Sequence, residues 1–371
     1  MNPARYIMLG GFLGAGKSTA VGHLARWLTR QGLRVGLVTN DQGSGLVDTL
    51  NFRTQGFDVE EIAGGCFCCR FESLQSAAEK LTRDSRPDVF IAEPVGSCTD
   101  LIATVSYPLR RIYGDSFIIA PLSVLLDPIR AFRILGWRPG RGFSAKVRYV
   151  YEKQMEEADC LIVNKTDLLE PTESQDLADA LRQRYPQKEL FQISARDEKG
   201  LVPWFESLLS DARAERPTMD LNYQRYGEGE ALLGWVNCTM IVNAPHGMDG
   251  NLLLESLAEA IQRSLGRTGG EVAHLKMTLM ESGGLGDLAL ISLVRQDFVP
   301  ELTQTIEEPV FQAQIVLNLR AESDPETLRK IVEDCAQSAN LDQEATLVLE
   351  HMESFSPQMP RPTHRITVAS T

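Results

Sequence analysis

Residues 10–19 read Gly-Gly-Phe-Leu-Gly-Ala-Gly-Lys-Ser-Thr, and residues 11–18 match the phosphate-binding pattern G-x-x-x-x-G-K-[ST]. An apolar strand candidate, residues 6–9, precedes the match, and a helical pattern with one apolar face follows it. The pattern needs this strand–loop–helix context. The alternative is a glycine-rich turn that binds nothing. The Lys-Ser pair and the flanking segments favour a site for a nucleoside phosphate.

Each residue type in this loop has a role in phosphate binding. Glycines at 11, 14 and 16 let backbone N–H groups turn inward, and the following helix adds its positive N-terminal end. We expect Lys17 to reach the β- and γ-phosphates and the Ser18 hydroxyl to hold Mg²⁺. The predicted nucleotide-binding residues of the loop are Gly11, Gly14, Ala15, Gly16, Lys17, Ser18 and Thr19.

Up to Leu209 the chain alternates between strand-like and helix-like runs. The apolar strands predict an α/β fold, in which a mostly parallel sheet has helices on both faces. The strand candidates are residues 6–9, 34–39, 88–92, 118–126, 160–163 and 190–193, and helical patterns include residues 72–82, 147–157 and 174–184.

The pattern changes after a polar, glycine-containing stretch. Beyond it, strand, helix, three strands, helix and strand follow one another, which is close to a split βαβ, ferredoxin-like α+β domain with one extra strand. We predict a P-loop NTPase domain over residues 1–214, a linker over 215–234, the smaller α+β domain over 235–353 and a flexible tail over 354–371.

Length and charge narrow the functional class. A chain of 371 residues suits two domains. The net charge is −13, and the excess is acidic beyond Pro217, where 10 basic residues face 22 acidic ones. Neither half offers the basic face of a nucleic-acid binder. The longest apolar stretch, residues 117–126, is short and interrupted by Pro121, so we expect no membrane span.

Seven cysteines, three of them in Cys66-Phe67-Cys68-Cys69, do not resemble a disulfide framework. An odd count, with no N-terminal segment of signal-peptide type, indicates a reducing cytoplasm and thiols kept for chemistry. Cys160, Cys238 and Cys335 lie within strand or helix patterns and are expected in the core. The five histidines are scattered, and no role is assigned to them.

Two further segments are candidates for the phosphate end of a nucleotide. Glu93 ends a buried strand, where its carboxylate can hold Mg²⁺ or its water, and Gly96 lets the backbone approach a γ-phosphate. Asp41, after the second strand, is the candidate to touch the metal or orient the attacking water. An ordinary solvated turn aspartate is an equal alternative for Asp41.

Asn164-Lys165-Thr166-Asp167 follows another strand and points to guanine. A carboxylate only accepts hydrogen bonds, so Asp167 suits the N1–H and exocyclic NH₂ of guanine and finds no such donor pair on adenine. Asn164 would brace neighbouring loops, and the Lys165 stem would lie along the base. Ser194-Ala195 follows the next strand, where a backbone N–H can meet the guanine O6. Together these residues predict GTP rather than ATP.

The stretch Gly64-Gly65-Cys66-Phe67-Cys68-Cys69 brings three thiols within four residues, so that they can converge on one soft cation. Zn²⁺ takes thiolates in a tetrahedron with about 2.3 Å bonds, and Co²⁺ or Ni²⁺ is also compatible. The alternative is a buried apolar cluster with a redox-sensitive pair. Cys98 is a candidate fourth thiolate, although an ordinary buried cysteine is the simpler interpretation.

Taken together, these motifs resemble the CobW family of P-loop GTPases, relatives of the metallochaperones HypB and UreG. The C-x-C-C element is close to diagnostic of that family. The family often continues its second strand as Asn-Glu-Phe-Gly, whereas this chain has Asn-Asp-Gln-Gly at residues 40–43, and it lacks a histidine-rich stretch. The C-terminal half is similar to the family's smaller domain in pattern only. The resemblance is carried by residues 10–19, 60–69, 93–96, 154, 158–159 and 164–167.

The resemblance implies a slow GTPase, using Mg²⁺, that carries Zn²⁺ or Co²⁺ at Cys66, Cys68 and Cys69 to a client metalloprotein or cobalamin pathway protein. Lys17, Asp41 and Glu93 would then serve catalysis. One alternative is a GTP-dependent regulator or assembly factor whose cysteines hold a structural zinc. A small-molecule P-loop kinase is disfavoured, because N-K-x-D has no purpose there. A homodimer is a further candidate state, and neither nucleic acid nor membrane is an expected partner.

Overall fold

The computed structural model describes residues 3–40, 47–210, 216–282, 288–342 and 345–368. The chain forms two compact units. Unit 1 comprises Met1–Gln42, Gln55–Tyr226 and Met359–Thr371, and unit 2 comprises Gly43–Thr54 and Gly227–Gln358. Each unit therefore takes a short segment from the other half of the sequence, which differs from the single linker predicted at residues 215–234.

Unit 1 is built on a parallel sheet with the strand order β3-β2-β4-β1-β6-β7-β8, and β5 pairs with β1 in addition. The central strands are apolar on both faces, which is the expected composition of a parallel sheet covered on both sides. The strands are β1 (Ala4–Gly11), β2 (Val35–Asn40), β3 (Asp58–Ile62), β4 (Val89–Glu93), β5 (Phe117–Ile119), β6 (Ser123–Leu126), β7 (Cys160–Val163) and β8 (Glu189–Gln192).

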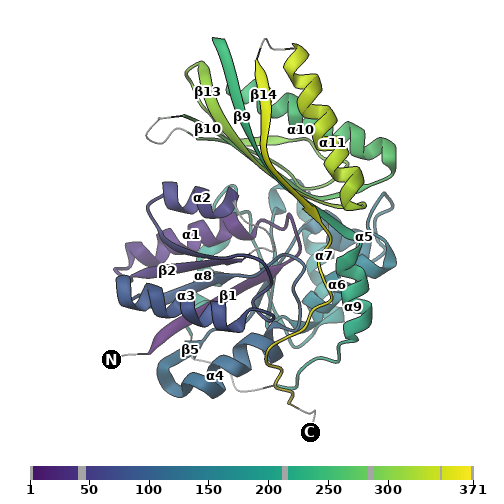
Figure 1. Ribbon diagram of the computed structural model, residues 1–371. Coiled ribbons are helices and arrows are strands. Elements are labelled where there is room, and N and C mark those ends of the chain that lie inside the picture. Colours follow the sequence, from purple (N-terminus) through teal and green to yellow (C-terminus); the bar gives the residue numbers. More distant parts are fainter. Residues whose placement is uncertain (1–2, 41–46, 211–215, 283–287, 343–344, 369–371) are drawn as a thin grey trace. The chain divides into compact units, whose positions relative to one another are not determined.

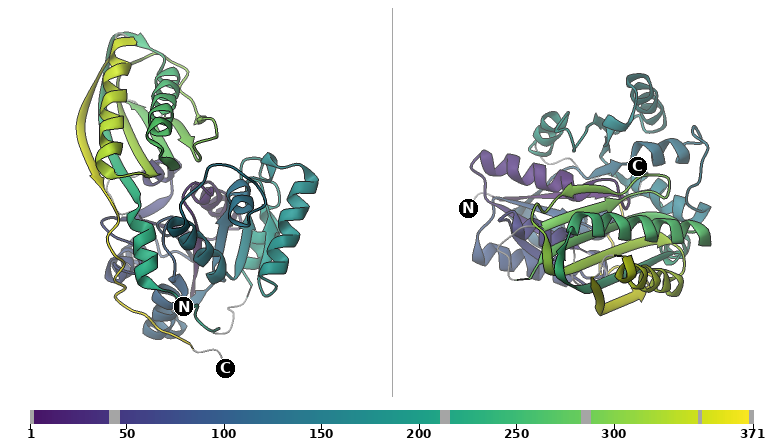
Figure 2. Two further views of the ribbon diagram at one scale, coloured as in Figure 1. Left: turned by 90° about the vertical axis from the view of Figure 1, so that its right-hand side faces the viewer. Right: turned by 90° about the horizontal axis from the view of Figure 1, so that it is seen from above.

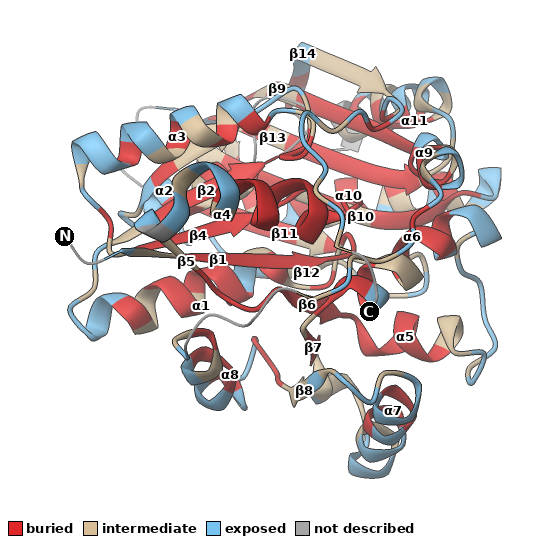
Figure 3. Ribbon diagram, turned by 90° about the horizontal axis from the view of Figure 1, so that it is seen from below, coloured by how far each residue is buried: buried red, intermediate tan, exposed pale blue. Residues whose placement is uncertain are grey.

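Helices cover both faces of this sheet. Helix α1 (Lys17–Arg30) and helix α3 (Phe71–Asp84) lie on opposite faces (Figure 1), and the strands between them are buried along their length (Figure 3). Trp27 of α1 packs against Phe205 with ring centroids 5.6 Å apart, which places α8 beside α1. The other helices of unit 1 are α4 (Tyr107–Tyr113), α5 (Pro128–Ile134), α6 (Ala145–Glu157), α7 (Pro171–Arg184) and α8 (Leu201–Leu208), with short helices η1 (Ile102–Ser106), η2 (Gly114–Ser116) and η3 (Thr166–Leu168). Helix α9 (Tyr223–Ala231) spans the boundary between the two units in the sequence.

The parallel sheet and its helices confirm the predicted fold class, and two details differ. Strand β3 reads Asp-Val-Glu-Glu-Ile, with too few apolar residues to be recognised, because it lies at the sheet edge and needs burial on fewer sides. The single strand predicted over residues 118–126 is two strands, β5 and β6, with Pro121 between them. Proline has no N–H for a ladder, so the strand divides there.

Unit 2 contains an antiparallel sheet with the order β12-β11-β10-β13-β9-β14. Helices α10 and α11 pack side by side on one of its faces (Figure 2). The order β10-β13-β9-β14 is that of a ferredoxin-like split βαβ fold, and β11 and β12 extend its edge by two strands. The elements are β9 (Leu233–Met248), α10 (Gly250–Thr268), β10 (Glu271–Glu281), β11 (Leu288–Leu293), β12 (Glu301–Gln304), β13 (Val310–Glu322), α11 (Pro325–Asp342) and β14 (Thr346–Phe355).

Helix α2 (Val47–Thr54) follows β2 in sequence but packs in unit 2, against β10 and β13. An ion pair joins Asp48 to Lys276, and the Val47 N–H donates to the Asn318 side chain at 3.1 Å. The Gln304 amide donates to the Asn51 side chain at 3.0 Å. The partners of α2 lie more than 200 residues away in the sequence, so the residue pattern near 47–54 does not predict that this helix packs in unit 2.

The last described residues also depart from expectation. Residues 359–368, predicted to be part of a flexible tail, make backbone hydrogen bonds in unit 1, including one from Ile366 N–H to Ala103 O at 2.8 Å. Helix α9 occupies part of the predicted linker. Among the described residues, no helix combines the length and apolar character needed to cross a bilayer.

Candidate nucleotide and metal site

The parallel sheet brings the predicted site residues to one edge. All carboxyl ends of parallel strands point the same way, and loops at that edge commonly form binding sites. Adjacent strands are about 4.8 Å apart, so the ends of β3 and β1, three steps apart in the order, are separated by about 14 Å. The segments that leave this edge are the cysteine loop after β3, Asn40 of β2, Glu93 of β4, the phosphate loop after β1, Asp127 after β6, Asn164 after β7 and Ser194 after β8.

The phosphate loop has backbone angles that its glycines alone accept easily. Gly11 has φ +131° and Gly16 has φ +92°. A Cβ at Gly11 would lie 2.4 Å from the carbonyl oxygen of Leu125, and one at Gly16 would lie 2.3 Å from the Asn164 amide nitrogen. The glycines therefore serve both the curvature of the loop and its close contact with strand β6 and with the loop after β7.

The phosphate end of the site gathers Lys17, Ser18 and Glu93. The Ser18 hydroxyl donates to Glu93 Oε1 at 3.0 Å, and Glu93 is buried at the end of β4. A hydroxyl beside a carboxylate is the type of oxygen pair that suits Mg²⁺, so these residues fit the expected ion. Lys17 is also buried, with Nζ 3.5 Å from Phe12 O.

Gly96 lies against the phosphate loop. A Cβ at this position would be 3.0 Å from the Leu13 backbone nitrogen, so only glycine lets the two loops approach this closely. Asp41, the third predicted catalytic residue, lies outside the described residues.

The base end contains the predicted Asn164, Asp167, Ser194 and Ala195. Asn164 donates to Ala15 O at 2.9 Å and accepts from the Ala195 N–H at 3.0 Å, so it ties the phosphate loop to the loop after β8. The Ser194 hydroxyl donates to Asp167 Oδ1 at 2.7 Å and holds this carboxylate in place. Of the Ser194-Ala195 segment, in which a backbone N–H is predicted to meet guanine O6, the Ala195 N–H donates to Asn164 in this structure.

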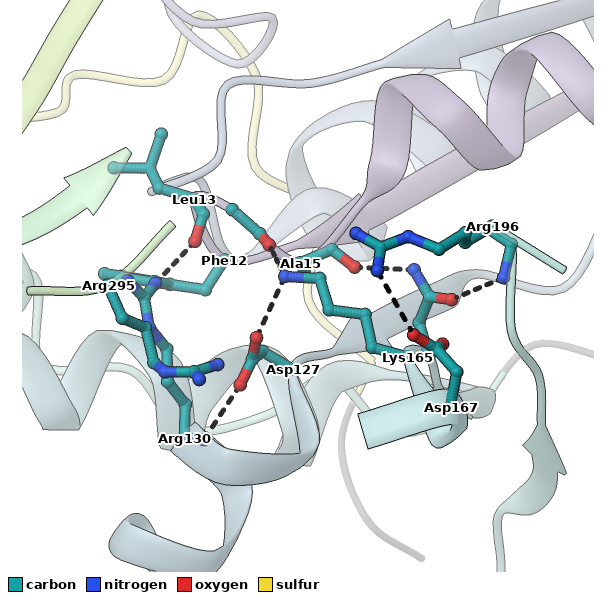
Figure 4. A network of polar contacts seen from close by, with 12 residues as sticks. Phe12, Leu13, Ala15, Asp127, Arg130, Lys165, Asp167, Arg196 and Arg295 are labelled. Carbon is teal, nitrogen blue, oxygen red and sulfur yellow. Dashed lines mark hydrogen bonds and ion pairs between the residues drawn. The ribbon is translucent and has the colours of Figure 1, made fainter. Parts of the chain in front are cut away.

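Asp127, Arg130 and Arg196 are neighbours of this site that sequence patterns did not single out (Figure 4). Lys165 Nζ donates to Gly14 O at 2.6 Å and to Asp127 Oδ2 at 2.9 Å, so Asp127 positions the lysine beside the phosphate loop. Arg130 is buried and donates to Leu13 O at 2.5 Å. Arg196 lies 3.8 Å from Asp167 Oδ2. The Asp-Pro pair that caps α5 is a helix-start signal that could have marked Asp127.

The three clustered thiols converge. The Sγ atoms of Cys66, Cys68 and Cys69 all lie within 4.8 Å of one another, with Cys66 and Cys68 buried and Cys69 partly exposed. The Cys66–Cys68 separation is 2.8 Å and the Cys68–Cys69 separation is 3.7 Å. Two sulfurs on a tetrahedral Zn²⁺ are about 3.8 Å apart, given bonds of about 2.3 Å, so small side-chain rotations would bring all three onto one ion.

The thiols share their charge unequally. Hydrogen bonds from Cys68, and then from Cys69 and Cys98, hold the pKa of the Cys66 thiol well below its usual range. Cys68 and Cys69 each form a hydrogen bond with Cys66. This bond raises the pKa of Cys68, and the corresponding bond raises the pKa of Cys69 to about 11. A bound cation would displace the thiol protons, because metal ligands bind as thiolates.

Asn40 connects the cysteine loop to β2. Its amide donates to Ile62 O at 2.9 Å and to Gly65 O at 2.7 Å, and its oxygen accepts from the Phe67 N–H at 3.0 Å. Strand β2 pairs with β4, and Thr39 lies opposite Glu93. Asn40 therefore attaches the cysteine loop to the strand that lies next to Glu93 at the phosphate end of the site. Asn40 was not assigned a role from sequence, since nothing nearby in the chain reveals these partners.

Helix α6 contacts the segment after β4 through the side chain of Glu157. Glu157 accepts from the Ile102 N–H at 2.6 Å and from the Thr99 hydroxyl at 3.3 Å, and it is buried. Burial, followed by the nearby charge of Asp100, raises the pKa of Glu157 to about 8. Glu157 is therefore mainly protonated in the folded protein at neutral pH.

The raised pKa of Glu157 predicts a stability that falls as pH rises. Between pH 4.5 and about pH 8, Glu157 keeps its proton in the folded protein but loses it in the unfolded chain. The free energy of unfolding is therefore highest below pH 4.5 and decreases as the pH rises through this range. We expect Glu157→Gln, which cannot ionise, to flatten the decline in melting temperature between pH 5 and pH 8. Parallel thermal melts of both proteins test this, and equal slopes would contradict the assignment.

Comparison with known proteins shows which family the chain resembles. Residues 5–192 match the family description CobW/HypB/UreG, nucleotide-binding domain. The chain is 27% identical over 199 residues to "Zinc chaperone CobW" of Sinorhizobium sp, covering 48% of this chain and 55% of that protein. It is 32% identical over 78 residues to "Zinc chaperone YjiA" of Escherichia coli (strain K12), covering 21% of this chain and 24% of that protein.

A solved structure of HypB from Helicobacter pylori in complex with nickel is also similar, with 19% identity, a TM-score of 0.41, and coverage of 56% of this chain and 86% of that one. This TM-score is too low to support a fold, which is shown instead by the strands and helices described above. The sequence matches to the two zinc chaperones span little more than half of the first and a quarter of the second. The family match, in contrast, covers more than half of this chain, and the protein therefore belongs to the CobW/HypB/UreG family and contains its nucleotide-binding domain.

Proposed function

We propose that this protein is a GTP-hydrolysing metallochaperone that binds Zn²⁺ or Co²⁺ at Cys66, Cys68 and Cys69 and delivers it to a client metalloprotein. The observation that carries the proposal is the convergence of three thiols on a loop fastened to β2, one strand from the Ser18–Glu93 pair. The relatives named as zinc chaperones support the same cargo.

The nucleotide part of the proposal assigns each residue a task. Asp167, oriented by Ser194, would accept hydrogen bonds from guanine, and Lys17 would neutralise charge on the β- and γ-phosphates. Bound Mg²⁺ would supply further positive charge at the γ-phosphate, and Ser18 and Glu93 are the residues that fit it. Asp41 remains the proposed residue for orienting water. Turnover would be slow without a partner that supplies a further cation.

Coupling between the two sites would follow from their shared strand edge. Phosphate-binding loops in GTPases change order between the GTP and GDP states. A change at β2 would reach the thiols through the three hydrogen bonds of Asn40, which hold the cysteine loop on both sides of Gly65. Linked sites typically differ by about 5- to 150-fold in affinity, which is enough to load metal in one state and release it in the other.

An anaerobic metal titration with a non-hydrolysable GTP analogue and with GDP tests the proposal. We expect the affinity for Zn²⁺ to differ between the two nucleotide states and to fall strongly in Cys66→Ala, Cys68→Ala and Cys69→Ala. Cys335→Ala, which removes a cysteine of α11 in unit 2, is the matched control and should bind like the parent. Equal, weak binding in all proteins would overturn the metal site. Tight binding that ignores the nucleotide would favour a regulator with a structural zinc.

A further inference from the structure

The last described segment of the chain belongs to unit 1 and lies across the cysteine loop. The Arg361 N–H donates to Cys69 Sγ at 3.2 Å. The Thr363 N–H donates to Cys68 O at 2.9 Å, and the Thr363 hydroxyl donates to Cys69 O at 3.4 Å. Residues 361–366 are called the strap below. The strap therefore contacts the backbone carbonyl groups of two clustered cysteines and the sulfur of one of them.

The far end of the strap is anchored beside a buried carboxylate. Arg365 Nε donates to Asp100 Oδ2 at 2.7 Å, and the Tyr223 hydroxyl donates to the same oxygen at 2.6 Å. Asp100 is buried, so water does little to stabilise its charge, and Arg365 supplies the opposite charge. The Ile366 N–H donates to Ala103 O at 2.8 Å. The strap is thus fixed at two places, on the cysteine loop and on the segment after β4.

The contact at Cys69 is important because of the position of this thiol. Among the three clustered thiols Cys69 is partly exposed, whereas Cys66 and Cys68 are buried. A chelator or another protein would therefore reach a bound metal from the side of Cys69, and the strap lies on that side. A metal-bound sulfur carries negative charge, so an N–H that donates to it forms a charge-assisted hydrogen bond.

We propose that the strap is part of the metal site, in which the Arg361 N–H supports Cys69 as a ligand and the docked segment slows the release of the metal. This inference deepens the proposed function and rests on it. Groups that hydrogen-bond to metal ligands typically change metal affinity by about 10- to 100-fold. The strap would thus retain the metal through the hydrogen bond to Cys69, without a bond of its own to the ion.

Docking of the strap and binding of the metal are linked in both directions. A strap that raises the affinity for zinc by a given factor is itself stabilised by bound zinc by the same factor. The state of the metal site is thereby transmitted to the surface, where Arg361 and Thr363 are exposed. A client protein that displaces the strap would weaken the bond to Cys69 and uncover the metal in the same movement.

A pair of substitutions at one position tests the hydrogen bond. Arg361→Pro removes the N–H, and Arg361→Ala keeps it while removing the same charged side chain. Residue 361 precedes Pro362 and is already restricted to extended conformations, which favours acceptance of proline. With zinc-loaded protein and an excess of EDTA, we expect Arg361→Pro to release zinc about 10- to 100-fold faster and Arg361→Ala to match the parent. Equal rates in Arg361→Pro and the parent would overturn the role of the N–H.

A substitution at the anchor tests docking separately from the N–H. Arg365→Ala removes the charge that pairs with Asp100 and leaves residue 361 unchanged. We expect it to speed zinc release in the same assay by about 10- to 100-fold, because an undocked strap no longer supports Cys69. Arg83→Ala is the matched control, since this arginine of α3 is 73% exposed and pairs with Asp84 at the surface. Release at the parent rate in Arg365→Ala would show that docking does not retain the metal.

Hydrogen exchange on the parent protein needs no substitution, so a poorly folding variant cannot hide the result. Because the linkage is reciprocal, zinc should slow exchange of the amides of Arg361 and Thr363 by about 10- to 100-fold. Zinc that binds tightly without slowing these amides would overturn the role of the strap and leave the metallochaperone standing. A parent protein that binds no zinc would end both proposals.

Discussion

Asp167→Asn is expected to reverse the base preference from guanine to xanthine. The affinity for GTP should fall by about 10³- to 10⁵-fold, because a site built for specific hydrogen bonds rejects a mismatched partner this strongly. Asparagine presents an NH₂ to the exocyclic NH₂ of guanine, where two donors meet. Xanthine has a carbonyl at that position and accepts the hydrogen bond.

The geometry around Asp167 makes this prediction sharp. Ser194 donates to one carboxylate oxygen at 2.7 Å, which leaves the group oriented before any base binds. Competition between GDP and XDP for a fluorescent nucleotide measures the preference. Asp179→Asn is the matched control, because Asp179 lies exposed on α7 and bonds only to helix neighbours among its described contacts. Unchanged GTP affinity in Asp167→Asn would contradict the base assignment.

Lys17→Ala is expected to lower the rate of GTP hydrolysis by about 10²- to 10³-fold, the usual effect of removing one donor that stabilises developing negative charge. Lys17 is buried at the first turn of α1, and its Nζ lies 3.5 Å from Phe12 O in the phosphate loop, where an ammonium can meet a bound phosphate. Phosphate release at saturating Mg²⁺ and GTP measures the effect.

Lys199→Ala is the control for the loss of a lysine. Its side chain is 77% exposed and pairs with Asp197 at the surface, so hydrolysis should stay within twofold of the parent. A Lys17→Ala protein that melts like the parent and still hydrolyses GTP at the parent rate would remove Lys17 from the catalytic role.

The arrangement of the candidate nucleotide-binding residues was largely predictable because each motif is short and contiguous. Each motif lies where one strand ends and a loop begins, so the local backbone determines which ligand groups its residues can contact. The parallel sheet then brings Ser18 to Glu93 and Asn164 to Ala15, as α/β topology requires. Asp127, which orients Lys165, was missed because a helix-capping aspartate has an ordinary structural explanation.

The residues around the cysteine loop were less predictable. Asn40 and Gln154 act through backbone carbonyl groups of distant loops, and no side-chain pattern encodes such partners. The proline-rich segment after β14 has no apolar period, so it was expected to be flexible. It is held instead by main-chain hydrogen bonds, which any sequence can form once a partner edge is present.

The sequence by itself determined the α/β fold class, the nucleotide-binding loop and a trio of thiols within four residues, because neighbours in a short loop cannot lie far apart. Only the tertiary structure decided what surrounds that trio. The pairing of β2 with β3 lets Asn40 hold the cysteine loop, and the path of the chain brings the Arg361 N–H to Cys69 Sγ across 292 residues. Such approaches arise from strand order and chain path, which are properties of the whole fold rather than of any local run of residues.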